Sequence, residues 1–408
     1  MTDLTSEQAT LRCVIMRGGT SKGLYFHEHD LPNPGPKRDK LLQRVMGSPD
    51  VLQIDGLGGS RPITSKVAII SKSQRDDADI NYTFAQVEIE RNLVVYTGNC
   101  GNISSGVGPF AIDEGLVNVQ EENTRVRIYN TNTERIIIAD VPVKNGKAKV
   151  EGSFAVPGVP GTGAEIAMNW ANTVGAKTGH LLPTGKPSDE ITLEDGKSIN
   201  ATLCDAANPC VCVLASDFGI DGSELVDEID GNTQLIDRVR EVRGKAGVLF
   251  GFCKDWQRVD DESPGLPMVG LVSPSKDYKT LSGTEIAEKD MDLRVRLIFM
   301  NRLHESIAGT ASVCLAVASC VKDSVVQKIV SRTGDVLRIG HPSGTTPTKV
   351  KAHPINEAPF VKFEYLGFSR TARRLMDCTA YYPQSALENV DEHVNREDTD
   401  SLPAVIHE

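Results

Sequence analysis

Two similar stretches of sequence decide the fold, NCGNISSGVGPFAIDEGLV at 99–117 and HESIAGTASVCLAVASCV at 304–321. Each follows a strand-like run, opens on a polar turn and continues into a helix of small and apolar residues. The second helix is apolar nearly all round, and Gly115 is placed to end the first. The repeat predicts two similar domains, each folded around one buried helix. The alignment behind it pairs Cys100 with His304, Ile103 with Ile307 and Gly106 with Thr310.

The starts of these two helices form the candidate binding site. A helix N-terminus leaves backbone N–H groups unpaired and carries a partial positive charge. Two helix starts that converge on one cleft would therefore bind a dicarboxylate or tricarboxylate. The alternative is that two buried helices share their composition by chance. The residues that we place at this cleft are Cys100, Gly101, Asn102, His304, Ser306, Gly309 and Thr310.

Strand-like patterns dominate the rest of the chain. Helical spacing occurs in 224–250, and the polar, turn-rich stretch 180–197 is placed as a domain boundary. This boundary divides the chain into 1–188 and 189–369, and the polar residues 385–408 are expected to form a mobile tail. The expected strands are 11–17, 62–70, 80–89, 125–130, 134–143, 199–206, 209–216, 293–300 and 374–383.

Composition and charge exclude several classes of protein. The chain has 408 residues and a formal net charge of −11, with no long run of Lys or Arg, so we expect no nucleic-acid partner and no membrane partner. The longest nearly apolar stretch, 311–321, is far shorter than the roughly 20 residues of a membrane-spanning helix. The N-terminal residues lack a signal-peptide pattern, and the nine cysteines are odd in number and scattered. We therefore expect a cytoplasmic protein with reduced thiols.

Lys66 is the candidate proton carrier. It stands at the start of the apolar run in SRPITSKVAII (60–70), with Thr64 and Ser65 beside it. In a dry cleft, desolvation would lower its pKa and make it a possible general base. The alternative is a surface lysine at a sheet edge.

Cys100 lies in an NCGN turn just before a helix, where the helix N-terminus would stabilise a thiolate. The turn GGTSKG (18–23) lacks the spacing of a phosphate-binding P-loop, so Thr20 and Ser21 are expected to help hold a carboxylate. A plain glycine turn is the alternative. His304 can exchange protons near neutral pH, or it caps a helix or pairs with Glu305.

Several stretches together resemble the PrpF-type isomerases, which include 2-methylaconitate cis–trans isomerase, methylitaconate Δ-isomerase, aconitate Δ-isomerase and 4-oxalomesaconate tautomerase. The resemblance covers most of the chain from Leu11 to Met376. It is carried by MRGGTSKGLYF, QIDGLGGSRPITSKVAII, GNCGNISSGVGPFAIDEGLV, VPGTGAEI, GAKTGHLLPTG, DAANPCVCV and SRTARRLM.

The resemblance implies a diaminopimelate-epimerase-like α+β fold. This fold has two pseudo-symmetric domains, each with a sheet wrapped around a central helix, and the active site lies between them. The last strand, 370–384, would return to the first domain. By motif, Lys66 and Cys100 would be the catalytic pair, Ser21 would contact substrate, and His304 would occupy the second-domain position.

Amino-acid racemases of this fold place a thiol on each side of the substrate. In this sequence His304 is expected to replace the second thiol, and Cys314 lies about three helical turns deeper. A two-thiol racemase is therefore disfavoured.

The expected function is that of a cofactor-independent isomerase that moves a proton across an allylic system in an unsaturated di- or tricarboxylic acid. We expect no metal and no cofactor, a small-molecule substrate and a possible homo-oligomer. The substrate-binding residues would be Thr20, Ser21, Ser65, Gly101, Asn102, His304, Ser306, Gly309 and Thr310. The alternatives are a racemase or epimerase of the same fold, or a carboxylate-binding accessory protein without activity.

Overall fold

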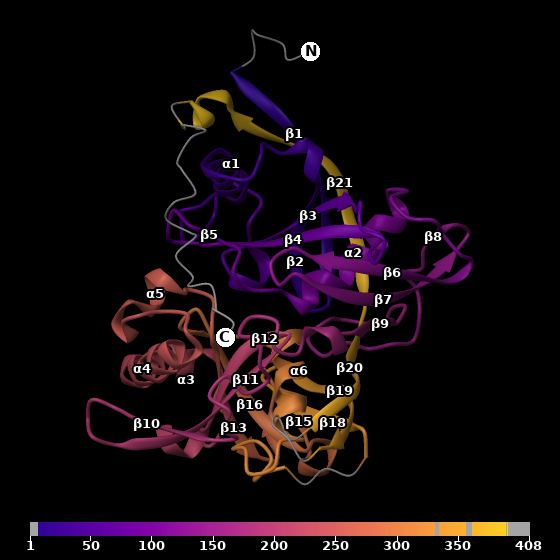
Figure 1. Cartoon of the computed structure of the whole chain (residues 1–408). Coiled ribbons are helices and arrows are strands. Elements are labelled where there is room, and N and C mark those ends of the chain that lie inside the picture. Colours follow the sequence, from indigo (N-terminus) through magenta and orange to yellow (C-terminus); the bar gives the residue numbers. More distant parts are fainter. Residues whose placement is uncertain (1–6, 331–333, 356–360, 389, 391–408) are drawn as a thin grey trace, which may run out of the picture.

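The protein folds into two lobes that are stacked along the long axis of the molecule (Figure 1). The computed structural model describes residues 7–330, 334–355, 361–388 and 390. Short 3-10 helices connect several of the elements: Glu28–Asp30, Pro62–Thr64, Ala171–Thr173, Ala215–Phe218, Trp256–Arg258, Glu288–Asp290 and Gln384–Leu387.

The first lobe is a mixed sheet wrapped around helix α2 (Gly101–Asp113), which is buried from Gly101 to Ile112. The sheet forms because its strands alternate between residues that face this helix and residues that face outward. Helix α1 (Pro36–Met46) covers the other face over a separate apolar cluster. The strands are β1 (Gln8–Gly18), β2 (Ser21–His27), β3 (Lys66–Lys72), β4 (Ile80–Val87), β5 (Val94–Val95), β6 (Glu122–Asn130), β7 (Arg135–Lys144), β8 (Lys147–Ala148) and β9 (Ile166–Asn169).

The second lobe repeats this plan around α6 (Gly309–Ala318), all of whose residues are buried. Its outer face is covered by α3 (Val226–Asp230), α4 (Thr233–Phe250) and α5 (Val259–Glu262). The strands are β10 (Asp189–Thr192), β11 (Ser198–Ala206), β12 (Asn208–Leu214), β13 (Met268–Pro274), β16 (Leu293–Phe299), β17 (Arg302–Leu303), β18 (Val336–His341) and β19 (Gly344–Pro354), with the small ribbon β14 (Tyr278–Lys279) and β15 (Glu285–Ile286).

Two late strands tie the lobes together. β20 (Val361–Arg370) pairs with β19 of the second lobe and with β9 of the first. β21 (Ala372–Pro383) then pairs with β1 along its whole length. The last described strand therefore lies in the lobe that contains β1, and β20 runs along the side of the molecule from the second lobe to the first (Figure 1). Most of the predicted tail, 389 and 391–408, lies outside the described residues.

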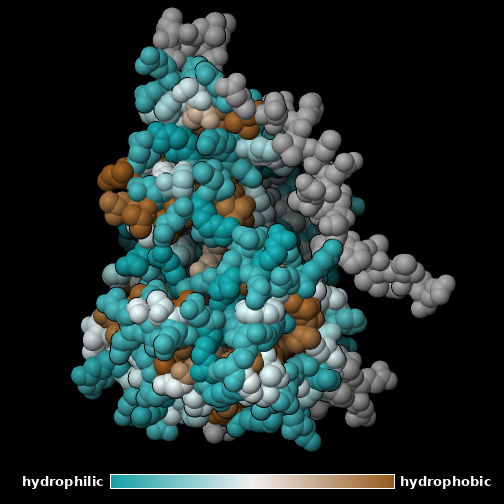
Figure 2. Space-filling model, turned by 90° about the vertical axis from the view of Figure 1, so that its left-hand side faces the viewer, coloured by the Kyte–Doolittle hydropathy of each residue, from teal (hydrophilic) through white to brown (hydrophobic). Residues whose placement is uncertain are grey.

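Figure 2 shows the face that carries α4 and α5. It is mostly hydrophilic, with separate hydrophobic patches. None of the helices in the described residues combines the length and the apolar composition that a bilayer crossing requires.

The repeat of a buried helix is real, but the predicted alignment is wrong by about one helical turn. The N-cap of α2 is Cys100, whereas the N-cap of α6 is Ala308. The helix starts therefore pair Cys100 with Ala308, and His304 lies in the turn before α6. That turn does not continue the helix because Ser306 donates its backbone N–H to His304 Nδ1, at 3.1 Å.

Candidate active site

Lys66 opens strand β3 and points into a pocket between the lobes. Its side chain is buried, and Nζ donates to Gln86 Oε1 at 2.7 Å. Two aromatic rings flank the amine, with centroids 5.2 Å from Nζ for Phe84 and 5.6 Å for Phe299. The alternative of a surface lysine at a sheet edge is therefore wrong.

Burial lowers the pKa of Lys66, because the protonated amine has lost its hydration. Interaction with Cys100 and the charge of Glu305 oppose this effect. A lysine whose pKa is lowered gives up its proton more readily than a free lysine, which suits it to accept and return a proton.

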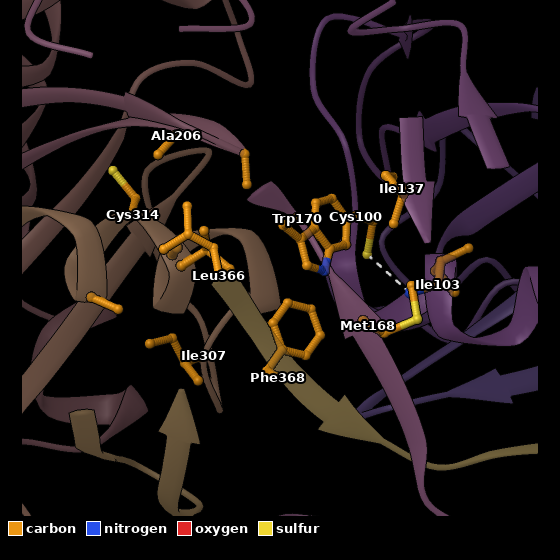
Figure 3. Close-up of a cluster of buried hydrophobic side chains, with 14 of the residues drawn as sticks. Cys100, Ile103, Ile137, Met168, Trp170, Ala206, Ile307, Cys314, Leu366 and Phe368 are labelled. Carbon is orange, nitrogen blue, oxygen red and sulfur yellow. Dashed lines mark hydrogen bonds between the residues drawn. The ribbon is translucent and has the colours of Figure 1, made fainter. Parts of the chain in front are cut away.

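Cys100 lines the same pocket, at the N-cap of α2, and interacts with Lys66. Its Sγ accepts the backbone N–H of Ile103 at 3.4 Å, the dashed contact in Figure 3. A thiolate formed here would face the N-terminal end of a buried helix, where negative charge is stabilised. Cys314 lies away from this position, on the other side of Leu366 (Figure 3).

His304 completes this group of ionisable side chains in the pocket. Burial lowers its pKa to about 3, and the charges of Lys66 and Arg370 act in the same direction. The ring is therefore neutral near pH 7. Since Nδ1 accepts the N–H of Ser306, the proton of the neutral ring is assigned to Nε2, which makes that atom a hydrogen-bond donor.

The two helix starts meet directly. A Cβ atom placed on Gly101 would lie 3.0 Å from both Gly309 Cα and Thr310 N, and 2.9 Å from Phe368 Cζ. Only glycine permits this approach of α2 to α6. Phe368 packs against both starts and stacks on Trp170, with ring centroids 5.6 Å apart (Figure 3).

Of the predicted substrate contacts Thr20, Ser21 and Ser65, the first contacts the start of α2 and the last faces away from the pocket. Thr20 Oγ1 accepts from Asn102 Nδ2 at 3.0 Å, so the GGTS turn reaches the start of α2. Ser21 is buried, and its hydroxyl has no hydrogen-bond partner within the described part of the chain. Ser65 faces away from the pocket, donating to Val87 O at 2.8 Å and accepting from Gln53 Nε2 at 2.8 Å.

Arg370 is a candidate functional residue that the sequence reading did not select. Its Nε donates to Asn102 Oδ1 at 3.0 Å, and its guanidinium lies 4.5 Å from the Phe368 centroid. Burial lowers its pKa to about 10, so it keeps its charge at neutral pH. No carboxylate in the described ranges forms an ion pair with it, and an unpaired buried cation favours an anionic ligand nearby. Arg370 lies in the stretch SRTARRLM, but its charge alone did not mark it as a site residue, because it acquires these neighbours only through the pairing of β20.

Asn208 was also missed. Its side chain accepts the backbone N–H of Asn99 at 3.0 Å and donates to Asn99 O at 2.7 Å and to Thr310 Oγ1 at 3.2 Å. It therefore joins the loop before Cys100 to the start of α6. The pocket as a whole is lined by Lys66, Phe84, Gln86, Val95, Gly98, Asn99, Cys100, Asn102, Asn208, Gly265, Met268, Phe299, His304 and Ala308.

The described ranges contain no group of three or more His, Cys, Asp or Glu side chains arranged to hold a metal ion. The ionisable groups of the pocket are an amine, a thiol and a neutral imidazole.

Residues 8–383 match the family described as PrpF protein. The chain belongs to the PrpF family. The predicted family is confirmed.

Relatives of this PrpF protein include three enzymes with named substrates. The 3-methylitaconate isomerase of Eubacterium barkeri is 44% identical over 94% of this chain and 100% of its own length. The 4-oxalomesaconate tautomerase of Pseudomonas putida is 38% identical, over 91% of this chain and 95% of its own. The 2-methyl-aconitate isomerase of Cupriavidus necator is 36% identical, over 93% and 98%.

Solved structures agree with the predicted α+β fold class. Methylitaconate-delta-isomerase superposes with a TM-score of 0.76 at 44% identity, covering 96% of this chain and 100% of that structure. A hydroxyproline epimerase from Agrobacterium vitis gives a TM-score of 0.57 at 13% identity, covering 92% and 93%, and shows the fold alone. The diaminopimelate-epimerase-like fold class is confirmed.

Proposed function

We propose that this PrpF protein is an isomerase of unsaturated di- or tricarboxylic acids that moves a proton across an allylic system without a cofactor. The observation that carries the proposal is the meeting of Lys66 and Cys100 in one buried pocket at the start of α2. The relatives named above act on acids of this kind. The net charge of −11 does not oppose an anionic substrate, because Arg370 and the two helix starts act at short range, whereas distant surface charges are screened beyond about 8 Å.

In the proposed reaction, a base removes a proton from the carbon next to the double bond. The electron pair delocalises through the double bond into the carboxylate, and the C–H bond breaks as the base–H bond forms. A proton is then returned to the other end of the allylic system, which shifts the C=C bond. Return to the original carbon after rotation would instead give cis–trans isomerisation. Lys66 and Cys100 are the two groups positioned to exchange this proton.

The intermediate carries delocalised negative charge, and the pocket offers several donors for it. These are the N–H groups at the starts of α2 and α6, the Nε2–H of neutral His304 and the amide of Asn102. Arg370, which donates to Asn102, adds a positive charge next to these donors. Donors held in place before the reaction stabilise such charge without reorganisation.

The test is proton exchange in deuterated water. Purified protein is incubated with methylitaconate, 2-methylaconitate or cis-aconitate, and proton NMR follows deuterium entry and double-bond movement. Lys66→Ala should lower the rate at least about 100-fold, the usual contribution of a general acid or base. Lys72→Ala, at the exposed end of the same strand, is the matched control and should retain the wild-type rate. Equal rates in Lys66→Ala and wild type would refute the proposed role of Lys66.

Racemisation of an amino acid is the weaker candidate. The position that corresponds to Cys100 in the second lobe is Ala308, whose methyl group cannot exchange a proton. The notion that His304 replaces a second thiol is thereby corrected. For the location, we propose the cytoplasm, where all nine cysteines would stay reduced; none of them forms a disulfide in the described residues.

A further inference from the structure

Gln86 stands directly opposite Lys66 in the antiparallel pair of β3 and β4. Its carboxamide is fixed in one orientation, because Nε2 donates to Ser65 O at 2.9 Å and to Pro62 O at 3.2 Å. Both amide hydrogens are thereby used. Oε1 is left facing Lys66 Nζ, which it accepts at 2.7 Å.

This partner is neutral, and its neutrality matters for the lysine. A carboxylate at the same place would form a buried ion pair with Lys66 and hold the amine protonated. An amide oxygen accepts a hydrogen bond from the ammonium and from the free amine alike. The other groups that act on the amine are Cys100, Glu305 and His304, together with the rings of Phe84 and Phe299.

Gln86 also lines a second cavity between the lobes. This outer cavity has a volume of about 290 Å³ and is lined by charged residues of both lobes, among them Glu88, Arg91, Asp260 and Arg302. Gln86 lines both spaces. The residue whose carboxamide accepts from the amine thus also borders the polar outer cavity.

We propose that Gln86 is the positioning residue of Lys66: it aims the amine into the pocket and, as a neutral acceptor, lets it change protonation state during turnover. The proposal rests on the proposed function for its catalytic meaning. The titration of the lysine itself can be measured without any substrate, so the two can fail separately.

The test is the titration of Lys66 followed by NMR in protein labelled with ¹³C at the lysine Cε. The signal of Lys66 is assigned by its loss in Lys66→Ala. Gln86→Glu should shift the Lys66 midpoint upward by at least about one pH unit, because it adds a negative charge beside the amine. Gln86→Met should shift it downward, because the acceptor is lost while the burial remains. Shifts of opposite sign are not expected from a merely structural role.

The matched control is Thr83→Glu, which adds the same charge three residues away on β4, roughly 10 Å along the strand. It should leave the midpoint unchanged. In the isomerase assay, Gln86→Glu should shift to higher pH the part of the kcat/KM–pH profile that reports the titration of Lys66. It should also slow turnover at pH 7 at least about tenfold.

Gln86→Asn gives a third measurement if either larger change prevents folding. It keeps the amide but withdraws it by one methylene, so kcat should fall several-fold with KM nearly unchanged. An unchanged Lys66 midpoint in folded Gln86→Glu, or equal midpoints in Gln86→Met and wild type, would overturn the proposal. If the midpoints shift as expected but the wild type has no isomerase activity, the proposed function is refuted, whereas the proposed effect of Gln86 on Lys66 stands.

Discussion

His304 shows at the scale of one residue how the pocket controls charge. Its folded-state pKa of about 3 lies below the ordinary value near 6.5, so the unfolded chain binds a proton that the folded protein excludes. Stability contributed by this residue is therefore complete above about pH 6.5 and is lost as the pH falls toward 3. The buried ring of His341, whose pKa is also lowered, acts in the same direction.

We predict that His304→Asn flattens the pH dependence of stability. Between pH 7.5 and pH 5, the wild type should lose about 2 kcal/mol through this one residue, and the variant should not. Urea unfolding at both pH values measures the difference. His180→Asn removes an exposed histidine and serves as the control, which should follow the wild type. A pH dependence in His304→Asn as steep as that of the wild type would show that the ring is not held neutral.

Sequence patterns selected Lys66 and Cys100 as separate candidates, because a lysine entering an apolar run and a cysteine in a polar turn are both unusual, and the family resemblance implied that the two form the catalytic pair. They could not select Arg370 or Gln86, which acquire their roles from partners on other strands. His304 was selected through an alignment that the helix starts do not support, although the pocket does contain it.

At the scale of elements, the contact of α2 with α6 depends on the glycines at the two helix starts, Gly101 and Gly309, which have no side chains. A Cβ on Gly309 would lie 2.5 Å from Cζ of Phe368, a ring already stacked on Trp170. The ring cannot retreat, so the start of α6 would have to move away from the pocket.

We predict that Gly309→Ala lowers kcat roughly 10- to 100-fold, because the donors at the start of α6 would be displaced by a fraction of an ångström or more. The overpacking should cost about 1–3 kcal/mol of unfolding free energy. Steady-state kinetics and urea unfolding measure the two effects. Gly270→Ala is the control, since its Cβ would meet neighbours only at 3.7–3.9 Å. Wild-type kcat in Gly309→Ala would mean that the approach of the helices is not needed for activity.

Each of the nine expected strands overlaps a strand of the structure, because alternation of apolar and polar residues is a local signal, but β2, β13, β18, β19 and β20 were not expected. The stretch 62–70 divides as expected into a turn, Pro62–Thr64, and strand β3. The start of α6 could not be placed correctly. The hydrogen bond from the Ser306 N–H to the His304 side chain holds the residues just before α6 in a turn. Such a contact produces no periodic pattern in the sequence.

At the scale of the whole molecule, the pocket exists only while the lobes stay docked. β20 was not among the expected strands, yet it joins the two lobes: it pairs with β19, which precedes it in the chain, and with β9, which lies far away in sequence. Asn208 also connects the lobes, because its carboxamide pairs with the backbone of Asn99 and with Thr310. Such pairings could not be predicted from local patterns.

We predict that Asn208→Ala loosens the loop that carries Cys100 and lowers kcat at least about tenfold. The substitution leaves the N–H and C=O of Asn99 buried without partners, at about 1–3 kcal/mol for each group. Hydrogen exchange of the peptide around Asn99 should therefore accelerate. Asn208→Asp should be no better, because it places a second oxygen against Asn99 O and Thr310 Oγ1 where the amide donated. Asn200→Ala, on the exposed face of β11, is the matched control. If exchange near Asn99 stays as slow in Asn208→Ala as in this control, the docking of the lobes at the pocket must depend on other contacts.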